Sequence, residues 1–127
     1  MTTSQKQGGY FGELKQQIQR TGQDGTKAVH HMPSDSSLFV ANKLDRGSAP
    51  AIIMDAADHA KTASFGNSTK AAAHQTKQLE LLNAGKFDDA FQMDIDDLKS
   101  LGLYEKYKPA INEMLEYIKA LKNEGRL

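Results

Sequence analysis

Apolar residues recur at helical spacing near the start of the chain. Phe11, Leu14 and Ile18 stand at positions i, i+3 and i+7, which places them on one face of a short helix. Gly22 and Gly25 follow within a few residues and favour the end of that helix. The pattern therefore predicts one short amphipathic helix in the first part of the chain.

The second half of the chain predicts three further helices. Residues 68–84 are rich in Ala, Gln, Lys and Leu, which favour helix, and residues 87–99 carry their apolar side chains on one side. The last helix is expected from about 107 to 123, because its apolar positions follow the 3.6-residue period. Pro109 would then lie in the first turn of that helix, where proline is tolerated.

Short apolar runs in the middle of the chain predict strands. A strand at 26–32 is halted by Pro33, an extended piece follows at 38–40, and a second strand at 51–54 comes after a turn rich in glycine and proline. Asp55 then begins a short helix that runs to about residue 63. The order strand, loop, strand and helix, set between helical regions, predicts an α+β fold that is mainly helical.

Length and composition limit the function classes. The 127 residues fit a single domain, with a flexible lead-in at 1–8, a core at 26–64 and a helical part at 68–123. The chain has no cysteine, which excludes disulfides, thiolate zinc sites and a cysteine nucleophile. Its 16 basic and 16 acidic residues cancel, which weighs against a nucleic-acid binder that works by bulk charge. No apolar run approaches the roughly 18 to 20 residues that span a bilayer, and the polar start lacks a signal-peptide core, so no membrane partner is expected.

Histidine and aspartate in the middle segment are spaced like the ligands of a metal ion. His30 and His31 are adjacent, and after 23 intervening residues Asp55 and His59 follow four apart, on one face of a helix. Without cysteine, a metal must rest on imidazole and carboxylate groups. One imidazole of a tandem pair can bind a divalent ion while its neighbour acts as a general base. The pattern therefore predicts a small hydrolytic metal site.

This ordering resembles the ββα-metal superfamily of endonucleases, also called His-Me finger or HNH, which includes the DNase bacteriocins. The resemblance implies a ββα-metal core flanked by an N-terminal helix and C-terminal helices. It also implies that His30 is a metal ligand, that His31 activates water, and that Asp55 and His59 complete the ligand set. The bacteriocin pattern has His, and other branches have Asn, where this chain has Asp55. The identity of the single divalent ion, whether zinc, magnesium, manganese or nickel, therefore stays open.

Three stretches of the chain, 29–34, 51–68 and 92–97, resemble the C-terminal toxin domains of bacterial polymorphic toxins of the RHS-repeat or contact-dependent inhibition type. The likeness spans roughly residues 28 to 121. It implies a monomeric DNase that is secreted or delivered as part of a larger toxin and acts on DNA in the target-cell cytoplasm. It also implies a cognate immunity protein, expected to be acidic where it covers the substrate groove.

Hydrolysis of a phosphodiester bond needs a deprotonated water and positive charge beside the phosphate. An imidazole pKa of about 6.5 suits His31, if it stays off the metal, for taking the proton from water at neutral pH. Lys61, Thr62, Ser64 and Ser68 follow the ligand helix and are expected to contact flanking phosphates through ammonium, hydroxyl or backbone N–H groups.

Several alternatives stay open. The two adjacent histidines could be ordinary strand residues, one facing in and one out. Asp55 could be only a helix N-cap, and Asp58 would be the ligand if the helix began later. His74 has no partner at i±3 or i±4 and is expected to be a surface or packing residue. The alternatives to a DNase are a metal-dependent RNase and a non-catalytic helical domain that binds a protein partner, whereas no Gly-x-Ser-x-Gly motif supports a serine hydrolase.

Overall fold

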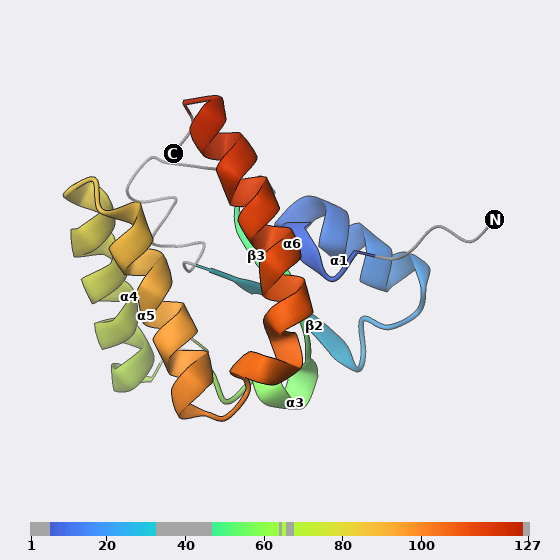
Figure 1. Ribbon diagram of the computed structural model, residues 1–127. Coiled ribbons are helices and arrows are strands. Elements are labelled where there is room, and N and C mark those ends of the chain that lie inside the picture. Colours follow the sequence, from blue (N-terminus) through green and yellow to red (C-terminus); the bar gives the residue numbers. More distant parts are fainter. Residues whose placement is uncertain (1–5, 33–46, 64, 66–67, 126–127) are drawn as a thin grey trace.

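A computed structural model describes residues 6–32, 47–63, 65 and 68–125 of the chain, so Pro33 and the extended piece expected at 38–40 lie outside the described residues. In chain order the elements are β1 (Gly8–Tyr10), α1 (Phe11–Arg20), β2 (Lys27–His31), β3 (Pro50–Asp55), α3 (Ala56–His59), α4 (Thr69–Asn83), α5 (Phe87–Ser100) and α6 (Tyr104–Asn123). Most of the described residues are helical, and the strands form one small sheet (Figure 1). The predicted α+β, mainly helical fold is therefore confirmed.

The sheet is antiparallel and has the order β1–β3–β2, so β3 lies in the middle. In the pairing of β2 with β3, His30 lies opposite Ile52 and His31 lies opposite Ala51. Successive side chains of a strand point to opposite faces of its sheet. The two adjacent histidines therefore lie on different sides of the sheet.

Helices cover both faces of the sheet (Figure 1). On one face, α1 contributes to a cluster of buried side chains formed by Leu14, Ile18, Val29, Ala51 and Ile53. On the other face, α5 and α6 pack on Met32, Ile52 and Met54. The middle strand thus has no side toward water, which explains why the predicted strand at 51–54 is apolar without alternation.

Helices α4 and α5 lie next to each other beside the sheet (Figure 1). Ser68 caps α4 by accepting a hydrogen bond from the N–H of Ala71. Gly85, with a φ of 75°, lets the chain turn directly after α4. The helices predicted at 68–84 and 87–99 are confirmed with small changes at their ends. Within the described part of the chain, no helix is both long and apolar enough to cross a membrane.

The ends of three elements differ from the prediction. Gly8–Tyr10 forms a strand where the lead-in was expected to end, since two glycines and one aromatic residue show no alternating pattern. The helix expected from Asp55 to about residue 63 ends at His59. Helix α6 begins at Tyr104, so the prediction that Pro109 lies in the first turn is wrong, and the proline sits inside the helix.

Strand β1 passes very close to α6 at Gly8. A Cβ atom built on Gly8 would lie 1.9 Å from the carbonyl oxygen of Ala110 and 2.9 Å from the backbone N of Met114. Both obstacles are backbone atoms of a long helix, so they cannot move aside as a side chain would. Glycine at this position is therefore what allows α6 to lie against the edge of the sheet.

We expect Gly8→Ala to lower the free energy of unfolding by about 3 kcal/mol, because an added methyl group would force β1 and α6 apart. Urea unfolding followed by circular dichroism measures this loss. Gly25→Ala is the matched control, since a Cβ there meets nothing within 4 Å. Equal stability of the two variants would contradict the close approach.

Candidate functional site

The structure brings two of the predicted metal ligands together. His30 comes from the end of β2 and His59 from the end of α3, directly after β3. Their ring centroids are 5.2 Å apart and the rings are almost perpendicular, at 70°. His30 is only 2% exposed, whereas His59 is partly exposed. A buried imidazole thus touches one that solvent can reach.

Both imidazoles of this pair favour the neutral form. Burial, together with the nearby imidazoles of His59, His31 and His74, lowers the pKa of His30 to about 3. Burial also lowers the pKa of His59. The Nε2 atom of His30 has no hydrogen-bond partner among the described residues, although it is buried. A buried polar atom without a partner is unfavourable, and a neutral imidazole nitrogen is a ligand for divalent ions.

His31, the predicted general base, lies on the other side of the sheet. Its ring stacks on Phe11 of α1, with the centroids 4.4 Å apart and the planes 18° from parallel. The imidazole is buried against this helix. The structure therefore does not place His31 next to the ring contact between His30 and His59.

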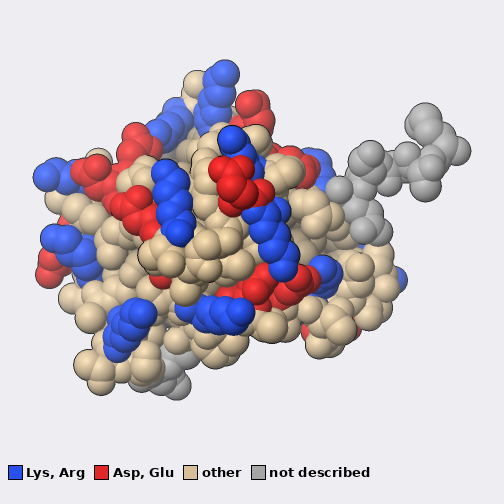
Figure 2. Space-filling view, turned by 60° about the horizontal axis from the view of Figure 1, so that its bottom comes forward, with Lys and Arg blue, Asp and Glu red and all other residues tan. Residues whose placement is uncertain are grey.

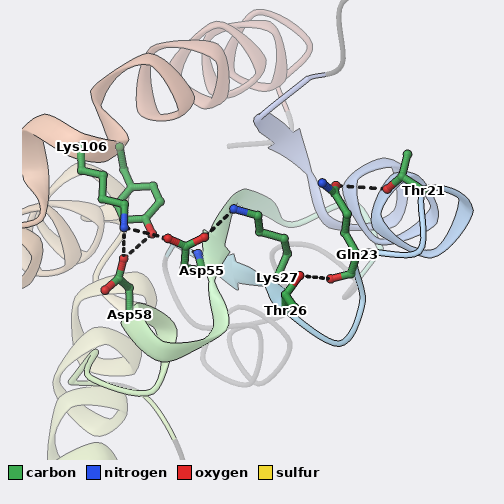
Figure 3. Close-up of polar contacts among 8 residues, drawn as sticks. Thr21, Gln23, Thr26, Lys27, Asp55, Asp58 and Lys106 are labelled. Carbon is green, nitrogen blue, oxygen red and sulfur yellow. Dashed lines mark hydrogen bonds and ion pairs between the residues drawn. The ribbon is translucent and has the colours of Figure 1, made fainter.

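Asp55 ends β3, and its carboxylate is bound by two lysines (Figure 3). Lys27 from the neighbouring strand contacts one oxygen, and the Nζ atom of Lys106 lies 2.7 Å from the other. The backbone N–H of Asp55 also donates to the Tyr107 hydroxyl at 3.0 Å. The hydrogen bonds from Lys106 and Lys27 lower the pKa of Asp55 to about 2.

Asp58, the alternative ligand, is held by the same helix. Lys106 Nζ and the Tyr107 hydroxyl lie 2.7 Å and 2.6 Å from one oxygen of the buried Asp58 carboxylate. These hydrogen bonds lower its pKa. We refer to Asp55, Asp58, Lys106 and Tyr107 as the corner cluster, because they join the start of α6 to the corner between β3 and α3.

The predicted ligand set of His30, Asp55 and His59 is therefore only partly assembled. His30 and His59 offer two nitrogen donors, but both oxygens of the Asp55 carboxylate have lysine partners. Across the described residues, no three His, Cys, Asp or Glu side chains lie close enough together to hold a metal ion. The residues present thus fit a divalent ion only as a pair of imidazoles, and the three-ligand set remains a prediction.

The predicted phosphate contacts differ in how available they are. The Lys61 side chain is largely exposed, and its Nζ atom lies 3.8 Å from Asp58. The hydroxyl of the buried Thr62 donates to the carbonyl of His59 at 2.8 Å. Ser64 lies outside the described residues. Ser68 serves as the N-cap of α4. Among Lys61, Thr62 and Ser68, the described members of this set, Lys61 offers an exposed charged group.

Phe65, which was not among the predicted site residues, lies against His59. Its ring meets that of His59 edge to face, with the centroids 5.2 Å apart and the planes at 83°. The preceding turn is fixed to α5, because the N–H of Ala63 donates to a carboxylate oxygen of Asp97 at 2.8 Å. The signal in the sequence is an aromatic residue in a polar stretch just after the helix that carries His59.

His74 has a buried partner that local spacing could not indicate. Its Nε2 atom lies 3.0 Å from Asp94 of α5, whose second oxygen accepts a hydrogen bond of 2.6 Å from Gln78. Burial raises the pKa of Asp94, and the hydrogen bond that Asp94 accepts from the protonated imidazole raises the pKa of His74. This network joins α4 to α5.

Scans against protein-family models, curated proteins and solved structures find no match for this chain.

The corner cluster leads to a stability prediction. Tyr107→Phe removes the hydroxyl that donates to Asp58 and accepts from the backbone of Asp55, so it should lower the free energy of unfolding by about 1–3 kcal/mol. Tyr104→Phe on the same helix is the control, because no hydrogen bond of its hydroxyl occurs among the described residues. Equal denaturation midpoints in urea would contradict a structural role of the Tyr107 hydroxyl.

The low pKa of His30 leads to a prediction about pH. Between about pH 6.5 and pH 3 the unfolded chain binds a proton at His30 that the folded chain does not, so stability should fall as the pH falls through this window. His30→Phe removes this contribution and should flatten the dependence by up to about 1.4 kcal/mol per pH unit. Urea unfolding of both proteins between pH 7.5 and about 5.5, with chelator present, compares the slopes. Parallel slopes would show that the pKa of His30 is the same in the folded and the unfolded chain.

Proposed function

We propose that this chain is a metal-dependent endonuclease of the toxin type, with the His30–His59 pair as its chemical centre. The observation that carries the proposal is the ring contact between a histidine at the end of one strand and a histidine on the short helix after the next strand. The connection β2, β3 and α3 has the order that a ββα-metal core requires. It supports the resemblance to His-Me finger nucleases noted from the sequence.

The protonation states of the pair suit hydrolysis of a phosphodiester bond. At neutral pH both imidazoles are neutral, so each has a lone pair that can bind a cation or accept a proton. A divalent ion bound there would stabilise the negative charge that develops on the phosphate and on the leaving oxygen. The exposed Lys61, two residues after His59, offers a further positive charge to the substrate backbone.

The identity of the general base depends on which face of the sheet the substrate reaches. The sequence predicts His31, but this ring packs on α1, on the other face of the sheet from His30. If His31 is the base, substrate must reach the α1 side of β2. If the base instead lies on the face of the sheet that carries His59, then His30 or His59 must take that role. Variants of the individual histidines separate the two cases.

The biological role follows from the resemblance and is proposed with it. A nuclease toxin delivered as part of a larger protein would act on DNA in the target-cell cytoplasm, and the producing cell would need an immunity protein that blocks it. RNA is the alternative substrate. A non-catalytic interaction domain is the competing function, and the packing of His31 on Phe11 and of His59 on Phe65 is the observation that favours it.

The proposal is tested by incubating purified protein with single-stranded DNA, plasmid DNA and RNA, each with and without a divalent ion. We expect cleavage of DNA that chelator stops, and a loss of at least about 100-fold in rate for both His59→Ala and His30→Ala. Lys77→Ala on the exposed side of α4 is the control and should cleave like the wild type.

Three results would change the conclusion. If both His30→Ala and His59→Ala still cleave, neither histidine takes part in the reaction. Loss of cleavage in His31→Ala with unchanged folding would support His31 as the general base. Full activity of this variant would exclude His31 and leave His30 or His59 as the base. No cleavage of any nucleic acid, with no effect of chelator on thermal unfolding, would favour the interaction domain.

A further inference from the structure

Phe65 is a large apolar side chain that lies exposed beside the candidate site. Among the described residues the exposed large hydrophobic side chains are Tyr10 at 39%, Phe65 at 47%, Leu101 at 37% and Leu115 at 41%. Single exposed apolar residues are common on protein surfaces and need no special explanation. Phe65 differs from the other three because it touches the candidate site, through its ring contact with His59.

Hydrogen bonds to α3 and α5 hold the segment that leads into Phe65. The N–H of Phe65 donates to the carbonyl of Thr62 at 3.2 Å, and the Thr62 hydroxyl donates to the carbonyl of His59 at 2.8 Å. The N–H of Ala63 donates to Asp97 of α5 at 2.8 Å. The backbone on the N-terminal side of the ring is therefore anchored to α3 and α5, which lowers the ordering cost when a ligand stacks on the ring.

Shielding His59 does not by itself require this arrangement. A side chain that only covers an imidazole would gain most by burying its own surface, and an aliphatic residue would serve equally well. Phe65 instead keeps nearly half of its surface open to solvent while its ring meets that of His59. An exposed aromatic ring at the edge of a hydrolytic site is the kind of surface on which nucleobases stack.

The charge of the chain points the same way. The net charge is zero, and Figure 2 shows basic and acidic side chains interspersed on the face that it presents. The net charge therefore supplies no bulk attraction for phosphate. A base-stacking contact does not depend on net charge, because every base has an aromatic face.

We propose that Phe65 is a stacking platform for an unpaired base next to the scissile phosphate, so that the site takes single-stranded or locally unpaired nucleic acid in preference to duplex. This inference rests on the proposed function and assigns its substrate class. A base can stack on Phe65 only when it is turned out of the duplex, which costs energy in double-stranded DNA. Single strands present their bases without that cost.

The experiment compares wild type, Phe65→Leu and Phe65→Tyr, with Leu115→Ala as a control that removes a similarly exposed apolar group from α6. Single-stranded oligonucleotides of one sequence carry an abasic site that is moved one nucleotide at a time along the cleaved region. For the intact oligonucleotide we expect Phe65→Leu to raise KM about tenfold with little change in kcat. Phe65→Tyr and Leu115→Ala should keep the wild-type KM.

The abasic series separates stacking from packing. At one position, loss of the base should raise the wild-type KM about tenfold but have no further effect in Phe65→Leu, because the stacking contact is already gone. The wild type should also prefer the single strand to the matching duplex. An unchanged KM in Phe65→Leu, or a fall in kcat that is the same for every abasic substrate, would mean that Phe65 only packs against His59, and the inference would be overturned.

Failure of the inference and failure of the proposed function are distinguishable. If the wild type cleaves nothing, the proposed function fails, and stacking is still judged by binding of fluorescent single-stranded oligonucleotides in the presence of chelator. Weaker binding by Phe65→Leu than by Phe65→Tyr would support the platform. No binding by the wild type, or equal binding by both variants, would overturn it.

Discussion

The position of His59 depends on how two carboxylates are neutralised at the corner between β3 and α3. Asp58 is buried, and an isolated charge in such surroundings would be strongly unfavourable. Lys106 and Tyr107 supply the required partners from the start of α6, and Lys106 also binds Asp55 at the end of β3. This cluster fixes the direction in which the chain leaves the sheet. The residue directly after Asp58 is His59, so the ring contact with His30 follows from the same constraint.

The sheet determines which groups can meet at the site. Both faces of β3 are covered, so a histidine at the end of β2 is buried whichever way it points. Alternation along β2 sends His30 toward His59 and His31 toward Phe11. Burial then keeps His30 neutral and leaves its Nε2 atom without a partner among the described residues. A buried, neutral imidazole in contact with a more accessible one is the arrangement on which the proposed chemistry depends.

Elements with a strong local pattern could be predicted from the sequence, whereas contacts between distant residues could not. The helices in the second half follow from their apolar period, and the order of strand, strand and helix around the histidines follows from short apolar runs. Strand β1 has too few residues to show alternation, and it is stabilised by α6, about 100 residues away in the chain. The lysine partners of Asp55 are 28 and 51 residues away from it, so the local spacing of Asp55 and His59, which predicts a ligand pair, could not indicate these ion pairs. The opposite directions of the His30 and His31 side chains could be predicted from the sequence, because adjacent residues of a strand point to opposite faces of the sheet.

The same cluster that positions the site also limits the charge available for substrate. Lys27 and Lys106 lie near the corner, but their ammonium groups are bound to Asp55 and Asp58. A phosphate that approached would compete with these carboxylates, and moving either lysine would loosen the corner that holds His59. Lys27 and Lys106 would therefore add little to the affinity for a polyanion, which would depend more on other groups, such as the exposed Lys61, backbone N–H groups and exposed aromatic rings. Under the proposed function, the exposed ring of Phe65 beside His59 would supply one contact of this kind without a net positive charge.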